Sequence, residues 1–471
     1  MDQQCAWHHD AAGMANGIVR VVLTADNHLS AYMPKLSPAR LAERRRRLGM
    51  AFKRTVDEAL ARRAHLFIQA GDLFDSVDPR NKEREFVAEQ LARLIRAGVH
   101  TLAVSGNHDT PRQRTQHGGV SPQGVYDRLG GLLYFAESHE LRPVPINVAG
   151  VRLAVAGLSS NPGAPPGADP LDDVELADSK GVLAGADLGI VILHAAIEGH
   201  CFPSESEAMI RRASLAKLTG FQVILAGHVH GFGRFGVGDK TVVVCGATEH
   251  MEFGGAEGAP GFAYLEFTRS GPRHAEHVPI EPQPRHVVTV RTTELWPPVR
   301  SGPDGDAVAT TNLPTSSSVA TAPSAVEGHG EAVHSDDGLR AATAIMQMTP
   351  ADVLIQRLEV ICTAEAMVRL CLEGPLTLDQ YRTLDLRRIW LYGQHHAFSF
   401  EIDESGLFPA SEGSQDVIAR GERVAPRDML EQVARERMES AETSDERALL
   451  LRTRERVLAR YDELVGREAS Q

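Results

Sequence analysis

Short apolar runs alternate with longer segments of mixed polarity in the first third of the chain. The apolar runs at residues 18–24, 65–70 and 101–105 are rich in branched side chains and predict buried strands. Residues 38–60 and 81–97 between them carry apolar positions at helical spacing, which are Leu41, Leu48, Phe52, Val56 and Leu60 in the first segment and Phe86, Leu91, Leu94 and Ile95 in the second. This β-α-β-α-β order predicts a layered α/β domain.

The predicted helices have recognisable ends. Ser37-Pro38 is typical of an N-cap followed by proline in the first turn, and Gly98 is typical of a helix stop. Arg44 to Arg47 are expected mostly on the exposed side of the first helix. This basic run is either a solvated helix face or a patch that contacts DNA phosphates.

A second group of apolar runs predicts a further set of strands. They lie at residues 151–156, 189–193, 221–226, 242–245 and 262–267. Residues 161–170 are rich in proline and glycine and predict a surface loop.

The remainder of the chain changes composition twice. Residues 297–350 contain few large apolar side chains and predict a disordered linker or insertion. After it, residues 367–373 and 398–402 are expected to be strands that flank a helix near residues 378–388, which makes a small α/β unit. Residues 426–466 are charged and helical in pattern, with an apolar stripe at Leu450, Val457, Tyr461 and Leu464. This stripe packs on its own domain or docks on a partner.

Composition places the chain among ordinary globular proteins. It has 471 residues, 42% hydrophobic and 24% charged, enough for two or more domains. No apolar run is long enough to span a bilayer, and residues 1–17 have no signal-peptide pattern and are expected to be a flexible extension. The five cysteines are scattered, which favours reduced thiols and a cytoplasmic location over a zinc finger.

The formal net charge of −13 argues against binding to nucleic acid through bulk charge. It does not exclude a nuclease that meets phosphates with metal ions and a local basic surface.

The candidate chemistry lies where the predicted strands end. The turn Gly106-Asn107-His108-Asp109 follows one strand, with Gly106 expected to let the backbone turn sharply. Polar side chains of ligand type follow other strands in the same way, and the whole set is Asp26, His28, Asp72, Asn107, His108, His194, His228 and His230. One such residue would be unremarkable, but this set at successive strand ends predicts a metal centre with two ions.

Imidazole and carboxylate ligands together suit Mn²⁺, Fe or Zn²⁺ better than Ca²⁺. Two ions roughly 3.5–4 Å apart can acidify a water molecule and clamp a phosphoryl group for in-line displacement. Such a pair needs a bridging carboxylate, and Asp72 has the central place in the order of motifs.

These motifs resemble a known family. Asp26-x-His28, Gly71-Asp72-Leu73-Phe74-Asp75, Gly106-Asn107-His108-Asp109, His194 and Gly227-His228-Val229-His230 resemble the calcineurin-like metallophosphoesterase signature. Pro111-Arg112, Gly246-Ala247-Thr248-Glu249, the Arg-rich first helix and the run from Val368 to Gly374 are similar to the SbcD-type DNA repair exonucleases. The motif-bearing resemblance covers roughly residues 18 to 285.

The resemblance implies a layered two-sheet sandwich flanked by helices, with two divalent ions that are expected to be Mn²⁺, with Fe or Zn²⁺ as alternatives. One ion would be held by Asp26, His28, Asp72 and His230, and the other by Asp72, Asn107, His194 and His228. A hydroxide that bridges the ions would attack phosphorus, and His108 would stabilise the transition state or protonate the leaving oxygen without binding metal. Asp75 and Asp109 are either carboxylates that orient the ligands or ordinary turn carboxylates.

The resemblance also implies a domain layout. Residues 1–17 would be the extension, 18–282 the phosphoesterase domain, 283–296 with 351–410 a small α/β capping domain, 297–350 the linker, and 411–471 the helical C-terminal segment. By the resemblance, that last segment would dock on an SbcC-like ATPase with a long coiled coil, and a homodimer is a further possibility.

The expected function is that of a DNA exonuclease or endonuclease subunit in DNA repair, so DNA is the expected substrate. The alternative is a phosphoesterase that acts on small nucleotides or other phosphodiesters, which the acidic net charge favours. A binding module without catalysis would need a degenerate site, and no ligand is missing. The chain departs from the family pattern at Ser30, where glycine is common, and in the long segment 297–350.

Overall fold

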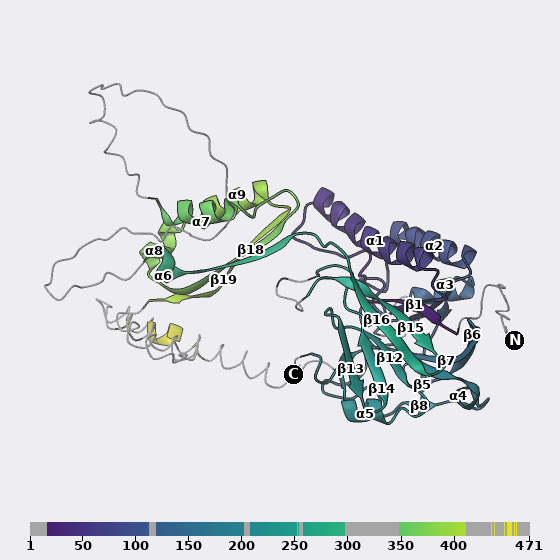
Figure 1. The fold of residues 1–471 in the computed structure, drawn as a ribbon. Coiled ribbons are helices and arrows are strands. Elements are labelled where there is room, and N and C mark those ends of the chain that lie inside the picture. Colours follow the sequence, from purple (N-terminus) through teal and green to yellow (C-terminus); the bar gives the residue numbers. More distant parts are fainter. Residues whose placement is uncertain are drawn as a thin grey trace, which may run out of the picture. The chain divides into compact units, whose positions relative to one another are not determined.

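The computed structural model describes residues 17–112, 119–201, 208–251, 253, 258–296 and 348–410, together with residues 435, 438, 447, 450–454, 456 and 458. The predictions for the N-terminal extension, the linker and the C-terminal helical segment lie outside the described residues, apart from a few positions. The described part is a mixed α/β fold (Figure 1).

One large sheet contains the first three predicted strands. Its six strands run in the order β16 (Gly271–Pro279), β15 (Gly261–Thr268), β1 (Val19–Thr24), β2 (Leu66–Ala70), β3 (His100–Val104) and β4 (Leu133–Tyr134). Strands β1 to β4 are parallel, and β15 pairs antiparallel with β1 and with β16.

A second sheet of six strands holds most of the later predicted strands. Its order is β13 (Gly233–Val237), β14 (Lys240–Val244), β12 (Val223–Gly227), β9 (Leu188–His194), β7 (Val151–Leu158) and β6 (Val144–Val148). The four central strands are parallel, and β6 and β13 pair antiparallel at the two edges.

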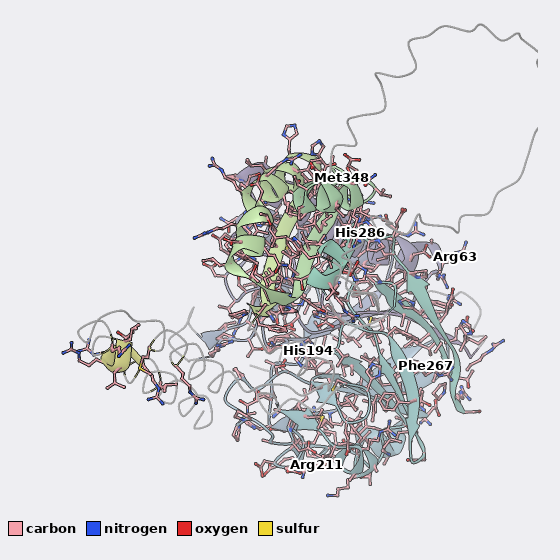
Figure 2. All side chains as sticks on the ribbon, turned by 90° about the vertical axis from the view of Figure 1, so that its left-hand side faces the viewer. Arg63, His194, Arg211, Phe267, His286 and Met348 are labelled. Atoms are coloured by element: carbon pink, nitrogen blue, oxygen red, sulfur yellow. The ribbon has the colours of Figure 1, made fainter. Side chains whose placement is uncertain are left out.

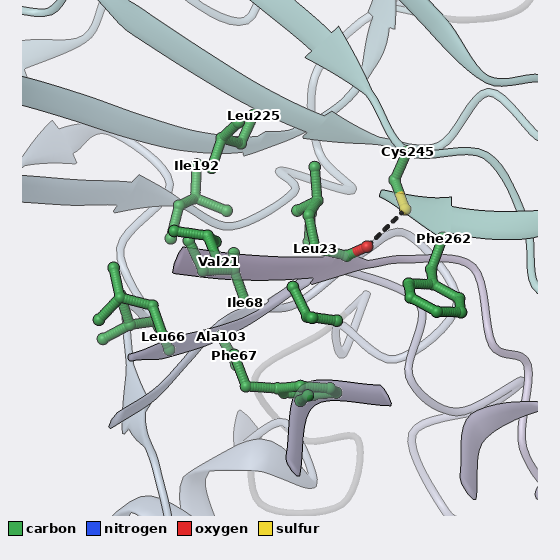
Figure 3. Close-up of a cluster of buried hydrophobic side chains, with 14 of the residues drawn as sticks. Val21, Leu23, Leu66, Phe67, Ile68, Ala103, Ile192, Leu225, Cys245 and Phe262 are labelled. Carbon is green, nitrogen blue, oxygen red and sulfur yellow. Dashed lines mark hydrogen bonds between the residues drawn. The ribbon is translucent and has the colours of Figure 1, made fainter. Parts of the chain in front are cut away.

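The main hydrophobic core contains side chains from both sheets. Val21, Leu23 and Ile68 of the first sheet pack in one cluster with Ile192 and Leu225 of the second (Figure 3). Along β9, alternate residues instead join a second cluster on the other face of the second sheet. Both faces of this sheet are therefore buried, as is usual for parallel strands that carry continuous apolar runs.

Helices α1 (Pro38–Ala61) and α2 (Asn81–Arg96) pack against each other and against the first sheet (Figure 1). Helix α1 begins at the predicted cap, where the Ser37 hydroxyl accepts a hydrogen bond from the Arg40 N–H. Two details of the prediction are wrong. Ile95 is 45% exposed, and Arg44, expected at the surface, is only 1% exposed.

The predicted small α/β unit contains three strands and more helix than expected. A sheet of β17 (Arg285–Arg291), β18 (Met367–Leu376) and β19 (Ser399–Pro409) is accompanied by α6 (Thr292–Leu295) and α7 (Pro350–Glu359). The single helix expected near residues 378–388 is instead two, α8 (Leu378–Thr383) and α9 (Leu386–His396). They are separate because Asp385 adopts φ 47° and caps α9 through the Arg388 N–H.

The chain divides into two compact units, of which the first contains residues 1–372 and 384–406. The shorter elements are α3 (Gln123–Arg128), β5 (Glu140–Leu141), β8 (Glu175–Leu176), α4 (Val182–Gly185), β10 (Ala196–Ile197), β11 (Met209–Ile210) and α5 (Arg212–Ala216). Within the described ranges, no helix has the length and apolar character needed to cross a bilayer.

Candidate metal centre

The predicted ligands are brought together at one edge of the two large sheets. Asp26, Asp72 and Asn107 follow β1, β2 and β3, which are parallel neighbours. His194 ends β9 and lies opposite Gly227 in the register with β12, so His228 follows directly beside it. Carboxyl ends of parallel strands meet at the same sheet edge, which explains why residues far apart in sequence converge. His194, labelled in Figure 2, is buried, with only 4% of its surface exposed.

The backbone at this edge is strained. Asp26, His28, Asp72 and His228 have φ of 48°, 44°, 52° and 91°, a region that residues other than glycine rarely adopt. Hydrogen bonds between the loop after β1 and the loop after β2 hold the first three of these residues in that conformation. The N–H groups of Asn27 and His28 both donate to the Asp72 carbonyl, at 2.9 and 3.1 Å. The surrounding fold therefore maintains a costly backbone geometry at the predicted ligands.

Asp72 and His194 form the buried centre of the cluster. The Asp72 Oδ2 atom lies 3.2 Å from His194 Nε2, and both side chains are almost completely inaccessible. The His194 Nδ1–H donates to the Ala70 carbonyl at 2.8 Å, which directs Nε2 toward the carboxylate. Burial disfavours the charged imidazole, but the Asp72 and Asp26 carboxylates outweigh it and raise the pKa of His194 to about 10.

Asn107 joins His194 to His228. Its side-chain oxygen lies 3.2 Å from His194 Nε2 and 3.1 Å from His228 Nδ1. The His228 N–H donates to the Asp26 carboxylate at 3.0 Å. Contacts through His194 and Asn107 therefore link the four residues predicted around the second ion, which are Asp72, Asn107, His194 and His228.

His28 and His230 also lie near the Asp26 and Asp72 carboxylates, and their ring centroids are 5.4 Å apart. Asp26 Oδ1 is 4.0 Å from His230 Nε2, and Asp72 Oδ2 is 4.0 Å from His28 Nε2. His28 Nδ1 lies 3.1 Å from Asp75 Oδ1, a contact that fixes the orientation of the His28 ring. Burial lowers the pKa of His28, but the Asp75 contact and the other carboxylates raise it above its ordinary value.

His108 differs from the other histidines because its side chain is 44% exposed. Its backbone N–H donates to Asp72 Oδ1 at 2.9 Å, and its Nδ1 atom lies 3.6 Å from Asp75 Oδ1. The ring packs edge to face against His28 at 4.7 Å. His108 is thus at the accessible rim of the cluster, with Asp75 shared between it and His28.

Asp109 is fully buried and forms hydrogen bonds to the loops after β2 and β3. Its carboxylate accepts hydrogen bonds from the N–H groups of Gly106 and Phe74, at 2.8 and 3.2 Å, and from the Gln123 side chain. Burial and the nearby Asp72 charge raise the pKa of Asp109 above its ordinary value. Asp109 therefore ties the third motif to the second.

The donor set fits divalent cations. Groups of three ligand atoms from Asp26–His28–His230 and from Asp26–Asp72–His194 lie within 4.8 Å of one another. The buried His28 Nε2 atom has no hydrogen-bond partner among the described residues. Carboxylate, amide and imidazole lone pairs that converge in a buried space repel one another unless a positive charge lies between them. Imidazole and carboxylate donors suit transition metals.

Two buried residues that support the ligand loops were not predicted from the sequence. Asn27 and Gln69 are buried between the ligand loops, where Asn27 donates to Thr24 Oγ1 at 2.8 Å and Gln69 to the Gly71 carbonyl at 2.7 Å. Gly106 was expected to provide a sharp turn, but its φ is not positive. A Cβ atom at Gly106 would lie 2.1 Å from Asp72 Oδ1, so glycine is needed there because the Asp72 side chain passes close to the backbone.

Sequence comparison matches residues 19–232 to the family model of the calcineurin-like phosphoesterases. The DNA double-strand break repair protein Mre11 of Methanopyrus kandleri is 27% identical over 294 residues, which is 59% of this chain and 60% of that protein. Mre11 of Saccharolobus solfataricus is 24% identical over 291 residues, which is 59% of this chain and 68% of that protein. The chain thus spans about 60% of the length of the first of these relatives.

Among solved structures, a dimetal phosphatase from Danio rerio aligns with 56% of this chain and 99% of its own, at 13% identity and a TM-score of 0.35. The match to the family model covers all of the ligand motifs, from Asp26 in the first to His230 in the last. The predicted family resemblance is confirmed for this region: residues 19–232 match the calcineurin-like phosphoesterases, and the chain is similar in sequence to Mre11 DNA repair proteins.

Proposed function

We propose that the protein is a metal-dependent nuclease that hydrolyses DNA phosphodiester bonds in DNA repair. The observation that carries this proposal is the convergence of Asp26, Asp72, Asn107 and four histidines at one sheet edge of a phosphoesterase domain. The similarity to Mre11 repair proteins supports DNA as the substrate.

The metal ligands are assigned by this proposal in two sets. Asp26, His28, Asp72 and His230 would hold one ion, and Asp72, Asn107, His194 and His228 the other. The ions, of which Mn²⁺ is the proposed native species, would supply positive charge for the phosphate oxygens and lower the pKa of water. The strained loops hold the ligand atoms in place before a metal arrives.

His108 is the proposed catalytic residue. Its exposed ring lies at the rim of the cluster, where a substrate phosphate can reach it. From that position the imidazole would stabilise the charge that develops on phosphate or give a proton to the leaving oxygen. Asp75 would hold the orientation of both His108 and His28.

The partner and the location belong to the same proposal. We propose an SbcC-like coiled-coil ATPase as the partner, with residues 426–466 as the docking segment because of their apolar stripe. A cytoplasmic location agrees with the scattered cysteines, and Cys245 and Cys362 carry buried free thiols.

The test is cleavage of labelled duplex and hairpin DNA by the purified chain with Mn²⁺, with and without the cognate ATPase. Cleavage should stop with EDTA and with Asp72→Asn, since this substitution removes the central carboxylate and keeps its shape. Asp78→Asn is the matched control, because Asp78 is 65% exposed and lies beside the same loop. No metal-dependent cleavage with the ATPase present would refute the proposal.

A phosphoesterase for small nucleotides is the second candidate, favoured by the net charge of −13. The same experiment separates the two when bis(p-nitrophenyl) phosphate and cyclic nucleotides are assayed in parallel. A kcat/KM far higher on a small diester than on DNA would favour the second candidate.

A further inference from the structure

Arg44 is a buried cation that the metal centre does not use. Its guanidinium lies 3.3 Å from Glu249 Oε2 and donates to Gln283 Oε1 at 3.0 Å, and it also donates to the His250 carbonyl. Arg44, Glu249 and Gln283 are each at most 4% exposed. These three side chains are called the buried network below.

A buried ion pair is an inefficient way to stabilise a fold, because desolvation opposes the attraction between the charges. It does, however, have directional contacts that an apolar cluster lacks, so it favours one arrangement of the elements it joins. The role of the buried network can therefore be inferred from the elements that it joins.

On one side, the buried network is attached to the ligand loops. Glu249 is two residues after Ala247, and the Ala247 N–H donates to the carbonyl of the predicted ligand His230 at 3.0 Å. Ala247 also forms a β-bridge with Ala25, directly before Asp26. Thr248 Oγ1 accepts a hydrogen bond from Asn27 at 3.3 Å. The segment 247–249 thus connects the metal centre to Arg44.

On the other side, the buried network reaches the cap, defined here as the described residues 283–296, 348–372 and 384–406. The backbone N–H of Gln283 donates to Glu249 Oε2 at 3.1 Å, and the Gln283 side chain donates to the Glu365 carbonyl at 3.0 Å. The Met367 N–H donates to the Pro284 carbonyl at 2.9 Å, so the first residue of β18 is held to the same segment. The cap and both large sheets belong to the same compact unit.

Contacts at the surface accompany this buried connection. Arg47 forms an ion pair with Glu365, Arg40 donates to the Gln394 carbonyl at 2.9 Å, and Lys35 lies 3.0 Å from Glu401. Lys35 is 71% exposed, and such solvated pairs constrain geometry weakly. The buried network is the stronger constraint because breaking it would leave a charge uncompensated inside the protein.

We propose that Arg44, Glu249 and Gln283 are positioning residues that fix the cap relative to the metal centre and thereby make the protein selective for DNA over small diesters. This inference rests on the proposed nuclease function. A polymeric substrate such as DNA would contact both the metal centre and the cap. A displacement of the cap relative to the centre would therefore slow the cleavage of DNA. A small diester needs the centre alone, and its hydrolysis is insensitive to the cap.

The experiment compares kcat/KM on hairpin DNA with kcat/KM on bis(p-nitrophenyl) phosphate, both with Mn²⁺, in the full chain. Glu249→Ala and Arg44→Met should lower the DNA value at least about tenfold and change the small-diester value and the bound metal by less than about twofold. Glu249→Gln keeps an acceptor for the Gln283 N–H and should retain more DNA cleavage than Glu249→Ala. Arg54→Met is the matched control, since Arg54 lies on the same helix outside the run from Arg44 to Arg47 and is 58% exposed.

Where a single substitution prevents folding, Arg44→Met/Glu249→Met removes both charges together and is expected to fold. It should show the same loss of DNA selectivity. Parallel losses on both substrates, or no loss on either, would overturn the positioning role and leave the nuclease proposal intact. A wild-type protein that hydrolyses the small diester but not DNA with the ATPase present would overturn the nuclease proposal, and this inference with it.

Discussion

At the scale of single residues, the centre depends on close approaches and strained dihedral angles. Gly106 leaves room for the Asp72 side chain, and Asp72 itself has φ 52°. The ligand types could be predicted from the sequence because they follow apolar strands. Their supports could not, since Asn27 and Gln69 carry no pattern that separates a buried amide from a solvated one.

His108 can be separated from the metal ligands by substitution. We expect His108→Ala to leave the metal content unchanged and to lower turnover by about 10²–10⁴-fold, because it removes a proton donor at the rim and no predicted ligand. Metal analysis of the purified variant and kcat on DNA measure the two effects. His274→Ala is a suitable control, since His274 is 50% exposed and lies on β16. Loss of metal from the His108 variant would show that His108 is a ligand. The structure allows this outcome, because ligand atoms of His28, Asp72 and His108 lie within 4.8 Å of one another.

At the scale of elements, the buried parallel strands were predicted well and the edge strands were not. Strands β2 and β9 are buried along their length and appear as continuous apolar runs. Strand β16 was missed because its exposed and buried residues do not alternate, as Arg273 and His274 are both exposed. Arg44 was misplaced for a related reason. Helical spacing cannot reveal that a carboxylate from a distant loop, Glu249, neutralises a charge on the buried side.

The pairing of β1 with β2 gives a prediction on pH. His65, directly before β2, accepts a hydrogen bond at Nδ1 from the Arg20 N–H of β1 at 3.0 Å. Burial and the Arg20 charge lower the pKa of His65 to about 4. The unfolded chain takes up a proton below about pH 6.5 and the folded chain does not, so the folded state loses stability as pH falls from 6.5 toward 4.

After allowance for solvent screening of this half-buried ring, the loss between pH 7.5 and pH 5 should be about 1–2 kcal/mol. His65→Asn keeps an acceptor for the Arg20 N–H and should lose less stability over the same interval. Urea denaturation at both pH values measures the difference, with the exposed His139→Asn as control. Identical pH dependence in the wild type and His65→Asn would contradict this account.

At the scale of the whole molecule, a chain with a net charge of −13 is proposed to act on a polyanion. The acidic surface does not draw DNA to the protein, so affinity has to come from local features. The metal centre is one such feature. The cap, which we propose to be fixed relative to the centre by the buried network, is the other. A coiled-coil ATPase that supplies further DNA contacts would offset the unfavourable charge of this chain.

The same centre should couple metal binding to the stability of the phosphoesterase domain. Its ligands come from β1, β2, β3, β9 and β12, so they converge only when both sheets are folded. Mn²⁺ at about 100 times its Kd should therefore raise the free energy of unfolding by about 2.7 kcal/mol for each site that it fills. Thermal unfolding with increasing Mn²⁺ measures this, and EDTA should reverse the shift. Asp72→Asn should show little shift, whereas the surface variant Asp78→Asn should follow the wild type. An equal shift in Asp72→Asn would mean that Mn²⁺ stabilises the protein elsewhere, and the ligand assignment would then fail together with the coupling.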